Sequence, residues 1–362
     1  MNKTNVLQLI DSLDLGGAET LAVNTYNLLA KEMYCNSFIC ATRLEGPLKK
    51  RLDSDDNYLF LKKTGSIDFR AIVRLKKFVQ KKQIQIIHAH SSSFFLAVCV
   101  KILYPKLKII WHDHYGKSEF LQNRKKTALK IASPFFSSII SINNILKTWA
   151  QNNLHCSYVN HVNNYAELDN FEKTTILSGI EGKRIVCLAA LRPQKDHLNL
   201  LKAFTKLHKN YSDWSLHLVG EGHDIEYLAK IKEFISTNQL EKNVFLYGGC
   251  LDINSILQQA TIGVLSSKSE GLPIALLEYG LAKLPVLVTD VGDCYKLTKR
   301  LHPNLRVSPE NNQEFYKQLK TLIDFTDETR ERMGSKLLEI VGKEYSAENY
   351  IKELINIYKK CL

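Results

Sequence analysis

Short apolar runs alternate with longer amphipathic segments along this chain of 362 residues. Apolar runs bounded by polar residues are typical of buried strands, and apolar positions that recur every three or four residues are typical of helices. The alternation of the two predicts an α/β protein with a mostly parallel sheet. In the first half the predicted strands are 5–10, 36–42, 57–61, 84–90, 107–113, 137–142 and 155–162, and the predicted helices are 19–33, 69–83, 94–104 and 124–136.

The same alternation restarts near residue 184, after a polar stretch at 163–183 that lacks periodicity. We expect a second sheet of about six strands here, and a final amphipathic helix that has no strand of its own. Two Rossmann-like βαβ domains result, and ligands of such sheets bind at the carboxyl ends of the strands, so the cleft between the domains is the expected site. The predicted strands are 184–191, 214–220, 243–249, 262–267 and 286–290, the helices are 196–211, 224–239, 253–260 and the one carrying Glu278, and the domain boundaries are 1–167, 168–343 and 344–362.

Charge is distributed unevenly between the two halves. Residues 1–165 hold 23 Lys and Arg against 11 Asp and Glu, whereas residues 166–362 hold 26 of each, so the whole net charge of +12 belongs to the first half. Such a field indicates an anionic partner: acidic lipid, a phosphorylated acceptor or nucleic acid. Nucleic acid is disfavoured because no reader motif accompanies the charge. The segment 118–136 has the composition of an interfacial helix on an anionic membrane, or of a core-facing helix with a solvated basic face.

Targeting signals and cysteine spacing bear on the compartment. No uninterrupted run of 18 apolar residues occurs, so a membrane span is not expected. The N-terminal segment lacks a signal-peptide pattern. Eight cysteines are scattered without a C-x-x-C spacing, which favours free thiols in a reducing compartment over a disulfide framework or a zinc site. We therefore expect a cytoplasmic protein.

Two glutamates eight positions apart, Glu270 and Glu278, give the strongest chemical signal. Glu270 lies in a turn rich in Ser, Gly and Pro, and Glu278 lies on the helix that follows. Carboxylates in these positions can accept hydrogen bonds from the paired hydroxyls of a sugar or a ribose. Gly271 and Pro273 allow the backbone to approach a ligand closely. Taken alone, the pair also fits one solvated glutamate and one on a helix surface.

Three further loops follow predicted strands. Gly16 and Gly17 stand at a helix N-terminus, which suits phosphate or a reacting sugar, although a turn that requires glycine explains them equally simply. Arg192 and Lys195 place two cations where they can hold a diphosphate, or else they are exposed neighbours of a helix cap at residue 196. Gly220 allows a nucleotide to approach the backbone, or serves a plain turn.

Histidines end two neighbouring strands of the first half. His88, His90, His112 and His114, with Asp113, could bind a metal or supply acid–base and polar contacts. A complete zinc site is not expected, because alternate strand positions point to opposite faces and only some of these side chains are expected to converge.

Taken in order, these motifs resemble those of the retaining glycosyltransferases of family 4, which have the GT-B fold. The resemblance covers nearly the whole chain, and its most specific element is E-x7-E with GLP inside it. It implies two Rossmann-like domains that face a central cleft, and a C-terminal helix that crosses back to the first domain. The motifs are GGAE at 16–19, KDH…LL.AF at 195–204, LVGEG at 218–222, SEGLPIALLE at 269–278 and TDVGD at 289–293.

The resemblance also implies residue roles. Glu270 would hold hydroxyls of the donor sugar and Glu278 the ribose, while Lys195 would bind the diphosphate and His112 would line the reaction centre. The remaining positions are Gly16, Gly17, Gly220, Gly271, Leu272 and Pro273 near the donor, and His90, His114 and Tyr115 near the acceptor.

Two positions depart from the family pattern. The family often has Gly-Arg where this chain has Ala189 and Ala190, so its usual diphosphate arginine is absent, and Arg192 is the candidate replacement. Lys283 stands where the family often has glycine.

The function implied is transfer of a hexose with retention, from a UDP- or GDP-linked donor to a glycan or a polyprenyl-diphosphate-linked glycan, in capsule, O-antigen or exopolysaccharide synthesis. No cofactor or metal is expected, and the enzyme would work in the cytoplasm, either free or bound peripherally at the inner face of the plasma membrane. The alternatives are a GT-B epimerase or phosphorylase, or a catalytically silent binding subunit; a nucleic-acid-binding protein comes third.

Overall fold

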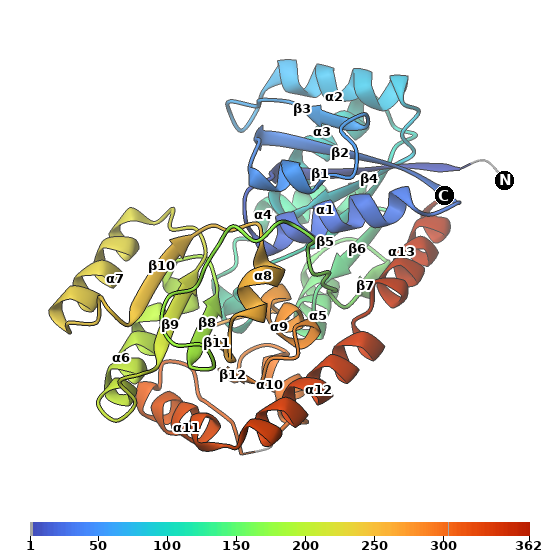
Figure 1. The fold of residues 1–362 in the computed structure, drawn as a ribbon. Helices are drawn as coiled ribbons and strands as arrows, with labels where there is room; N and C mark the ends of the chain where they lie inside the picture. Colours follow the sequence, from blue (N-terminus) through green and yellow to red (C-terminus); the bar gives the residue numbers. More distant parts are fainter. Residues whose placement is uncertain (1–2, 303) are drawn as a thin grey trace. The chain divides into compact units, whose positions relative to one another are not determined.

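The computed structural model describes residues 3–302 and 304–362, which form two compact units (Figure 1). Unit 1 comprises Met1–Asn164 together with Ala347–Leu362, and unit 2 comprises Tyr165–Ser346. The first unit is therefore discontinuous in sequence, because the last helix of the chain belongs to it. Residues 163–178 and 181–183 contain no helix or strand, in agreement with the polar pattern of this stretch.

Unit 1 is built on a seven-stranded parallel sheet with the order β3-β2-β1-β4-β5-β6-β7. All seven strands lie where the apolar runs predicted them. The order reverses between β1 and β4, so this is the switch point of the sheet, where ligands of such folds bind. The strands are β1 (Thr4–Ser12), β2 (Cys35–Leu44), β3 (Tyr58–Phe60), β4 (Ile86–His90), β5 (Lys108–Asp113), β6 (Ser138–Ser141) and β7 (Val159–His161).

Helices cover both faces of this sheet. On one face, apolar residues of α2, α3, α4 and α5 share a core cluster with Leu7, Ile87 and Trp111 of the strands. On the other, α1 and α13 pack together and contact the alternate residues of β1 and β4, such as Gln8 and His88. The helices are α1 (Gly17–Ala30), α2 (Phe69–Lys81), α3 (Phe94–Leu103), α4 (Thr127–Ala132), α5 (Asn144–Asn153) and α13 (Ala347–Cys361), with 3-10 turns η1 (Pro47–Arg51), η2 (Ser91–Ser93), η3 (Ser118–Asn123) and η4 (Ser133–Phe135).

The segment 118–136 does not form the single amphipathic helix that its composition suggested. It contains the turn η3, the six-residue helix α4 and the turn η4. Arg124, counted there as part of a basic face, is 95 % buried because its guanidinium pairs with Asp113. The prediction of an interfacial helix in this segment is therefore wrong.

Unit 2 contains a five-stranded parallel sheet with the order β10-β9-β8-β11-β12, so its switch point lies between β8 and β11. The sequence predicted about six strands; beyond β12 the structure has only an isolated bridge between Thr289 and Val307. The strands are β8 (Arg184–Leu188), β9 (Ser215–Val219), β10 (Val244–Gly248), β11 (Ile262–Leu265) and β12 (Val286–Val288), and the helices are α6 (His197–His208), α7 (Ile225–Thr237), α8 (Ile253–Gln258), α9 (Ile274–Leu281), α10 (Cys294–Thr298), α11 (Asn312–Asp324) and α12 (Asp327–Glu344), with the 3-10 turn η5 (Pro193–Lys195).

Helix α12 packs against the end of α9 through a glycine. A Cβ atom on Gly334 would overlap the backbone carbonyl of Lys283, whereas a Cβ on Gly342 of the same helix would meet nothing within 4 Å. We expect Gly334→Ala to lower the free energy of unfolding by about 2 kcal/mol or more, because backbone cannot yield as a side chain does. Gly342→Ala, the matched control, should raise it by up to about 1 kcal/mol. Thermal unfolding of both variants checks this, and equal melting temperatures would contradict it.

Two further expectations from the sequence concerned disulfide bonds and membrane-spanning helices. None of the eight cysteines, all of which the structure describes, forms a disulfide. Among the described residues, no helix is both long enough and apolar enough to cross a bilayer.

Candidate active site

Two loops of unit 2 meet beside its switch point. One follows β8 and contains Arg192 and Lys195, and the other follows β11 and contains Glu270. Because β8 and β11 are adjacent parallel strands, both loops leave the same edge of the sheet. The two predicted cations and the first glutamate of the pair therefore lie on loops that follow neighbouring strands.

Lys195 and Glu270 form an ion pair in this site. The Lys195 Nζ atom lies 2.5 Å from Oε1 of Glu270, and the two side chains are only 13 % and 6 % exposed. Ser267 donates a hydrogen bond of 2.6 Å to the same carboxylate oxygen. One carboxylate oxygen thus has two donors, which holds the Glu270 side chain in a fixed orientation.

Further hydrogen bonds join the two loops to each other. The side-chain amide of Gln194 donates a hydrogen bond to the carbonyl of Ser269 at 2.8 Å. The backbone carbonyl of Gln194 accepts one from the backbone N–H of Lys268 at 2.9 Å. The Ser266 hydroxyl lies 3.0 Å from the carbonyl oxygens of both Lys195 and Asp196. The positions of the lysine and the glutamate are therefore coupled through the backbone as well as through their ion pair.

A third loop, the TDVGD stretch after β12, packs against the backbone of Glu270 and Gly271. Gly292 has φ +55°, and a Cβ there would overlap the carbonyl oxygens of Glu270 and Gly271. Asp293 donates its backbone N–H to the Gly271 carbonyl at 2.9 Å. Glycine is required at this position by both its conformation and its close approach.

The other donor-side residues predicted in unit 2 differ in exposure. Glu278, on α9, is 92 % buried, and Gly271, Leu272 and Pro273 are buried in the turn before that helix. Arg192 is exposed, and in the described part of the chain its side chain makes no ion pair. It is therefore available to an anion.

Gly220 has a structural reason to be glycine. A Cβ on this residue, which follows β9, would overlap the backbone carbonyl of Ala189 at the end of β8. The packing of the two strand ends thus excludes a side chain here, whether or not a nucleotide approaches.

In unit 1, the glycine pair lies at the switch point as well. Gly16 is the N-cap of α1 and Gly17 is its first residue, and a short turn joins them to the end of β1. A Cβ on Gly16 would overlap the carboxylate of Glu19, a residue of the first helical turn. The loop after β2 packs on this turn, because a Cβ on Gly46 would overlap the carbonyl of Leu13.

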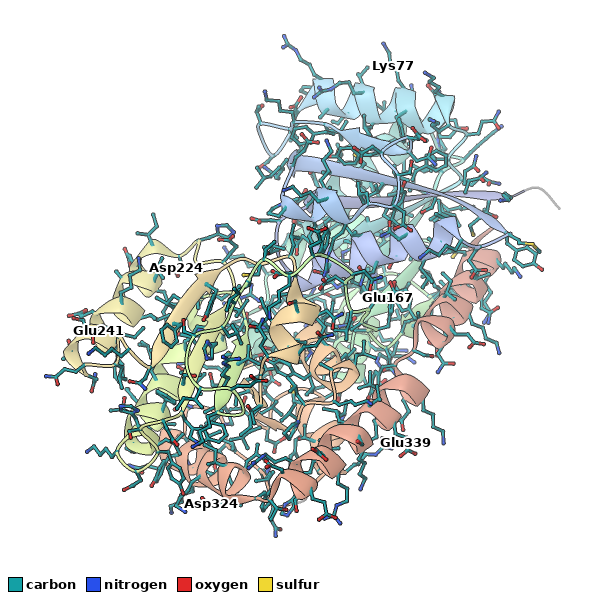
Figure 2. All side chains as sticks on the ribbon, viewed as in Figure 1. Lys77, Glu167, Asp224, Glu241, Asp324 and Glu339 are labelled. Atoms are coloured by element: carbon teal, nitrogen blue, oxygen red, sulfur yellow. The ribbon has the colours of Figure 1, made fainter. Side chains whose placement is uncertain are left out.

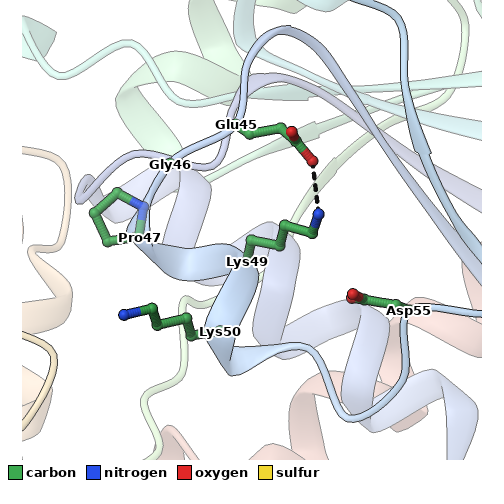
Figure 3. A pocket seen from close by; sticks show the side chains of 6 residues that line it. All are labelled: Glu45, Gly46, Pro47, Lys49, Lys50 and Asp55. Atoms are coloured by element: carbon green, nitrogen blue, oxygen red, sulfur yellow. Dashed lines mark hydrogen bonds and ion pairs between the residues drawn. The ribbon is translucent and has the colours of Figure 1, made fainter.

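A hollow of about 490 Å³ lies on the loop that follows β2 in unit 1 (Figure 3). Lys49 pairs with Glu45 at 2.9 Å across it, while Lys50 is exposed. None of the predicted site residues lines it. The lining residues are Glu45, Gly46, Pro47, Lys49, Lys50 and Asp55.

The four histidines near the ends of β4 and β5 converge and Asp113 does not, in agreement with the expectation that only some of these five side chains would converge. His88 and His90 are two positions apart, as are His112 and His114, and His90 lies opposite His112 in the strand register. Side chains two positions apart point to the same face and neighbouring side chains to opposite faces, so the histidines lie together and Asp113 points away from them. Nε2 of His88 lies 3.1 Å from Nδ1 of His112, and Nδ1 of His90 lies 3.0 Å from Nε2 of His114.

Asp113 does not join the histidines. It points to the opposite face of β5, where Arg124 donates two hydrogen bonds of 2.7 Å to its two oxygens. The guanidinium also lies 4.4 Å from the ring centroid of Tyr115 and 4.1 Å from that of Trp149. Tyr115, predicted near the acceptor, thus stacks on a buried ion pair.

Burial keeps the histidines neutral. It lowers the pKa of His88 and of His114 to about 3, and lowers the pKa of His90 and of His112 well below the ordinary value. Ring nitrogens of His88, His90 and His112 lie within 4.8 Å of one another, a spacing that a metal ion could bridge. Five of these six nitrogens are already hydrogen-bonded within the protein, and only Nε2 of His112 has no partner among the described residues. The cluster is therefore organised as a hydrogen-bond network.

Family models match both halves of the chain. The model described as Glycosyl transferases group 1 matches residues 172–337, and the model Glycosyltransferase Family 4 matches residues 15–157. The chain belongs to the family 4 glycosyltransferases. Its matched segments include every motif on which the resemblance rested.

Similar proteins agree with this membership. An uncharacterized glycosyltransferase of Haemophilus influenzae is 25% identical over 347 residues, covering 93% of this chain and 95% of its own length. The UDP-Gal:alpha-D-GlcNAc-diphosphoundecaprenol alpha-1,3-galactosyltransferase of Escherichia coli is 24% identical, covering 96% and 92%. The structure of Anabaena Alr3699/HepE with UDP-glucose superposes with a TM-score of 0.78 at 15% identity, over 98% and 99% of the two chains. This family 4 glycosyltransferase therefore has the GT-B fold.

The departure at Lys283 has a clear geometric meaning in this glycosyltransferase. Lys283 follows α9 with φ +58°, a left-handed conformation that favours glycine. A lysine here is strained but accommodated, because its side chain is exposed. Glycine, which the family often has at this position, adopts such a conformation without strain.

Several residues of the candidate site were not predicted from the sequence. Ser267 could have been noticed, since it lies three residues before Glu270 in the same turn. Gln8 is a polar residue in the apolar first strand, and Tyr358 lies on the C-terminal helix; both contact the histidines. No local pattern joins positions 350 residues apart.

Proposed function

We propose that this chain is a retaining glycosyltransferase that moves a hexose from a nucleotide-sugar donor to a glycan or a polyprenyl-diphosphate-linked glycan during synthesis of a cell-surface polysaccharide. The Lys195–Glu270 pair at the switch point of unit 2 carries the proposal. Two of the relatives that the chain resembles are named for O-antigen synthesis or a diphosphoundecaprenol acceptor, which supports the substrate class.

In the proposed reaction, donor binding replaces the ion pair. Lys195 turns to the diphosphate and stabilises the negative charge that grows on it as the glycosidic bond breaks. Glu270, released from the lysine but still held by Ser267, accepts hydrogen bonds from sugar hydroxyls. Glu278 binds the ribose hydroxyls, and the backbone near Gly271 approaches the sugar. Arg192 adds a second positive charge, so the proposal assigns no metal to the diphosphate.

The acceptor is assigned to unit 1. Its surplus of positive charge favours an acceptor that carries a diphosphate. His112 would lie at the reaction centre, while His90, His114 and Tyr115 would lie near the acceptor, and Gly16 and Gly17 near the phosphates. No residue is assigned as a nucleophile.

Acceptor-dependent transfer tests the proposal. The purified chain is incubated with radiolabelled UDP-, GDP- and ADP-hexoses, each with and without a polyprenyl-diphosphate N-acetylglucosamine, and the anomeric configuration of the product is determined by NMR. We expect label in the lipid with the configuration of the donor. Conversion of one donor sugar into another without acceptor would indicate an epimerase, and formation of a sugar phosphate from inorganic phosphate would indicate a phosphorylase. If the chain neither binds nor turns over any donor, it is a catalytically silent subunit.

We also propose that unit 1 binds the cytoplasmic face of an anionic membrane, and that α2 makes the contact. On this helix Phe69 is 77 % exposed and Val73 is 46 % exposed, beside the exposed cations Arg70 and Lys77. Lys77 projects from the outer side of the helix (Figure 2). Of the exposed large apolar side chains among the described residues, only Ile176, Ile180 and Ile225 belong to unit 2. Apolar and basic groups together on one helix face suit an anionic lipid surface.

Vesicle flotation tests the membrane contact. Arg70→Gln/Lys77→Gln should weaken binding to vesicles containing phosphatidylglycerol by about thirtyfold, because each cation near such a surface contributes about 1 kcal/mol. Lys230→Gln/Lys232→Gln, which removes two exposed cations from α7 of unit 2, is the control and should bind as the wild type does. Equal losses in the two variants, or no salt-sensitive binding by the wild type, would contradict the assignment.

A further inference from the structure

A continuous chain of hydrogen bonds links the C-terminal helix to His112. The Tyr358 hydroxyl of α13 lies 2.8 Å from Nδ1 of His88, and Nε2 of His88 lies 3.1 Å from Nδ1 of His112. Gln8 of β1 joins the same chain, since its amide nitrogen donates to the Tyr358 hydroxyl at 3.4 Å and its oxygen lies 2.9 Å from Nε2 of His90. All of these groups are in unit 1, and each is at least 98 % buried.

The orientation of the Gln8 amide, together with the number of protons available, sets the direction of every bond. A neutral imidazole has one N–H donor and one acceptor nitrogen. The Gln8 oxygen can only accept, so Nε2 of His90 carries the proton there, and Nδ1 of His90 accepts from His114. The Tyr358 oxygen accepts from the Gln8 amide, and its own proton has Nδ1 of His88 as the acceptor within reach.

The same counting extends to the last ring. With Nδ1 of His88 as an acceptor, its proton lies on Nε2 and is donated to Nδ1 of His112. His112 must then carry its own proton on Nε2, the one buried nitrogen of the network with no partner in the described part of the chain. A buried donor without an acceptor is costly and is usually matched by a ligand or water.

We infer that Tyr358 and Gln8 are positioning residues that act through His88 to fix His112 as an Nε2–H donor, presented to an oxygen atom of the substrate. The inference rests on the proposed function for the assignment of His112 to the reaction centre. It adds that this histidine does not serve as a general base, because its free nitrogen already holds the proton. It also assigns the last turns of the chain a part in catalysis, although they follow unit 2 in the sequence.

The tautomer of His112 is directly measurable. Long-range ¹H–¹⁵N correlation spectra of the full chain labelled with ¹⁵N-histidine distinguish a protonated ring nitrogen from a bare one, and His112→Gln assigns the signals. We expect Nε2 of His112 to be protonated and Nδ1 bare in the wild type without substrate. A His112 ring protonated on Nδ1 would overturn the inference. This readout needs no turnover, so it remains informative even if no donor is found and the proposed function fails.

Tyr358→Phe removes the hydroxyl that sets the direction of the relay. We expect His112 to lose its single tautomer and kcat to fall about fivefold with little change in KM for the donor, since one buried hydrogen bond contributes about 1 kcal/mol. Tyr350→Phe is the matched control: Tyr350 is also buried on α13, and its hydroxyl lies 2.9 Å from Thr25 Oγ1 on α1.

The two variants separate positioning from simple stabilisation. Both lose one buried hydroxyl from the same helix, so a purely structural role predicts similar losses of stability and of activity. The inference requires that only Tyr358→Phe changes the His112 spectrum and kcat. Equal kinetic effects in the two variants, or an unchanged His112 tautomer in Tyr358→Phe, would overturn it. If Tyr358→Phe does not fold, the wild-type spectrum alone decides.

Discussion

Lys195→Ala should lower kcat by about two to three orders of magnitude, the loss typical of removing one preorganised charge contact, or about 3 to 4 kcal/mol in the barrier. The reason is that the lysine is held 2.5 Å from Glu270 and is only 13 % exposed, so its charge is fixed in position before the donor binds. Steady-state kinetics with the donor found in the transfer assay measure this loss. Glu270→Ala should have an effect of the same order, because it removes the acceptor for the sugar hydroxyls.

The control for this prediction is Lys268→Ala in the loop after β11. Lys268 pairs with Glu310, and its side chain is 35 % exposed. Its removal takes away the same charge close to the site while its backbone N–H still bonds Gln194. We expect less than a threefold change in kcat, since an exposed ion pair contributes less than about 1 kcal/mol. Near wild-type turnover by folded Lys195→Ala would refute the assigned site.

Arg124→Met should destabilise unit 1 by about 3 to 5 kcal/mol, because it leaves the buried carboxylate of Asp113 without its charge partner. Both side chains are at least 95 % buried, and the guanidinium makes two hydrogen bonds of 2.7 Å. Urea unfolding followed by tryptophan fluorescence measures the loss, since Trp111 and Trp149 lie beside the pair. Asp113→Asn/Arg124→Met should recover most of it, because no buried charge remains.

The effect of pH has a definite sign. Burial raises the pKa of Asp113 above its ordinary value, and Arg124 opposes that shift. Without the arginine the pKa rises further, so the folded state binds the proton more tightly than the unfolded state does. The deficit of Arg124→Met is then largest at neutral pH and shrinks as the pH falls toward the raised pKa. A deficit independent of pH, or a double variant no more stable than the single one, would contradict this explanation.

The sequence predicted the sheets well because the strands of parallel sheets are continuous apolar runs. It failed where helices are polar or short. The helix α5, Asn144–Asn153, was not predicted because it has few apolar positions, and residues 124–136 read as one helix although Pro134 and a buried arginine interrupt it. The spacing of apolar residues along the chain indicates which positions are buried. It does not indicate that a charged side chain is buried against a partner distant in sequence.

In the candidate site, too, some residues could be predicted from the sequence and others could not. Glu270 and Lys195 stood out because loops after strands carry unusual residues, and the structure pairs them. The roles of Gln8, Tyr358 and Ser267 depend on contacts made only after folding. The convergence of the four histidines follows from their two-residue spacing, although the prediction did not specify which of the five side chains, the histidines and Asp113, would converge.

Helix α13 completes unit 1 from the far end of the chain, and this fixes the order of events during synthesis. When the N-terminal half leaves the ribosome, Gln8 and His88 are not yet covered by α13. All of unit 2 is translated before Tyr350 and Tyr358 can make their contacts with the first half. A nascent chain stalled before Ala347 therefore presents an unfinished polar surface. Expression of the first 164 residues alone would yield a half that lacks the segment sealing its sheet.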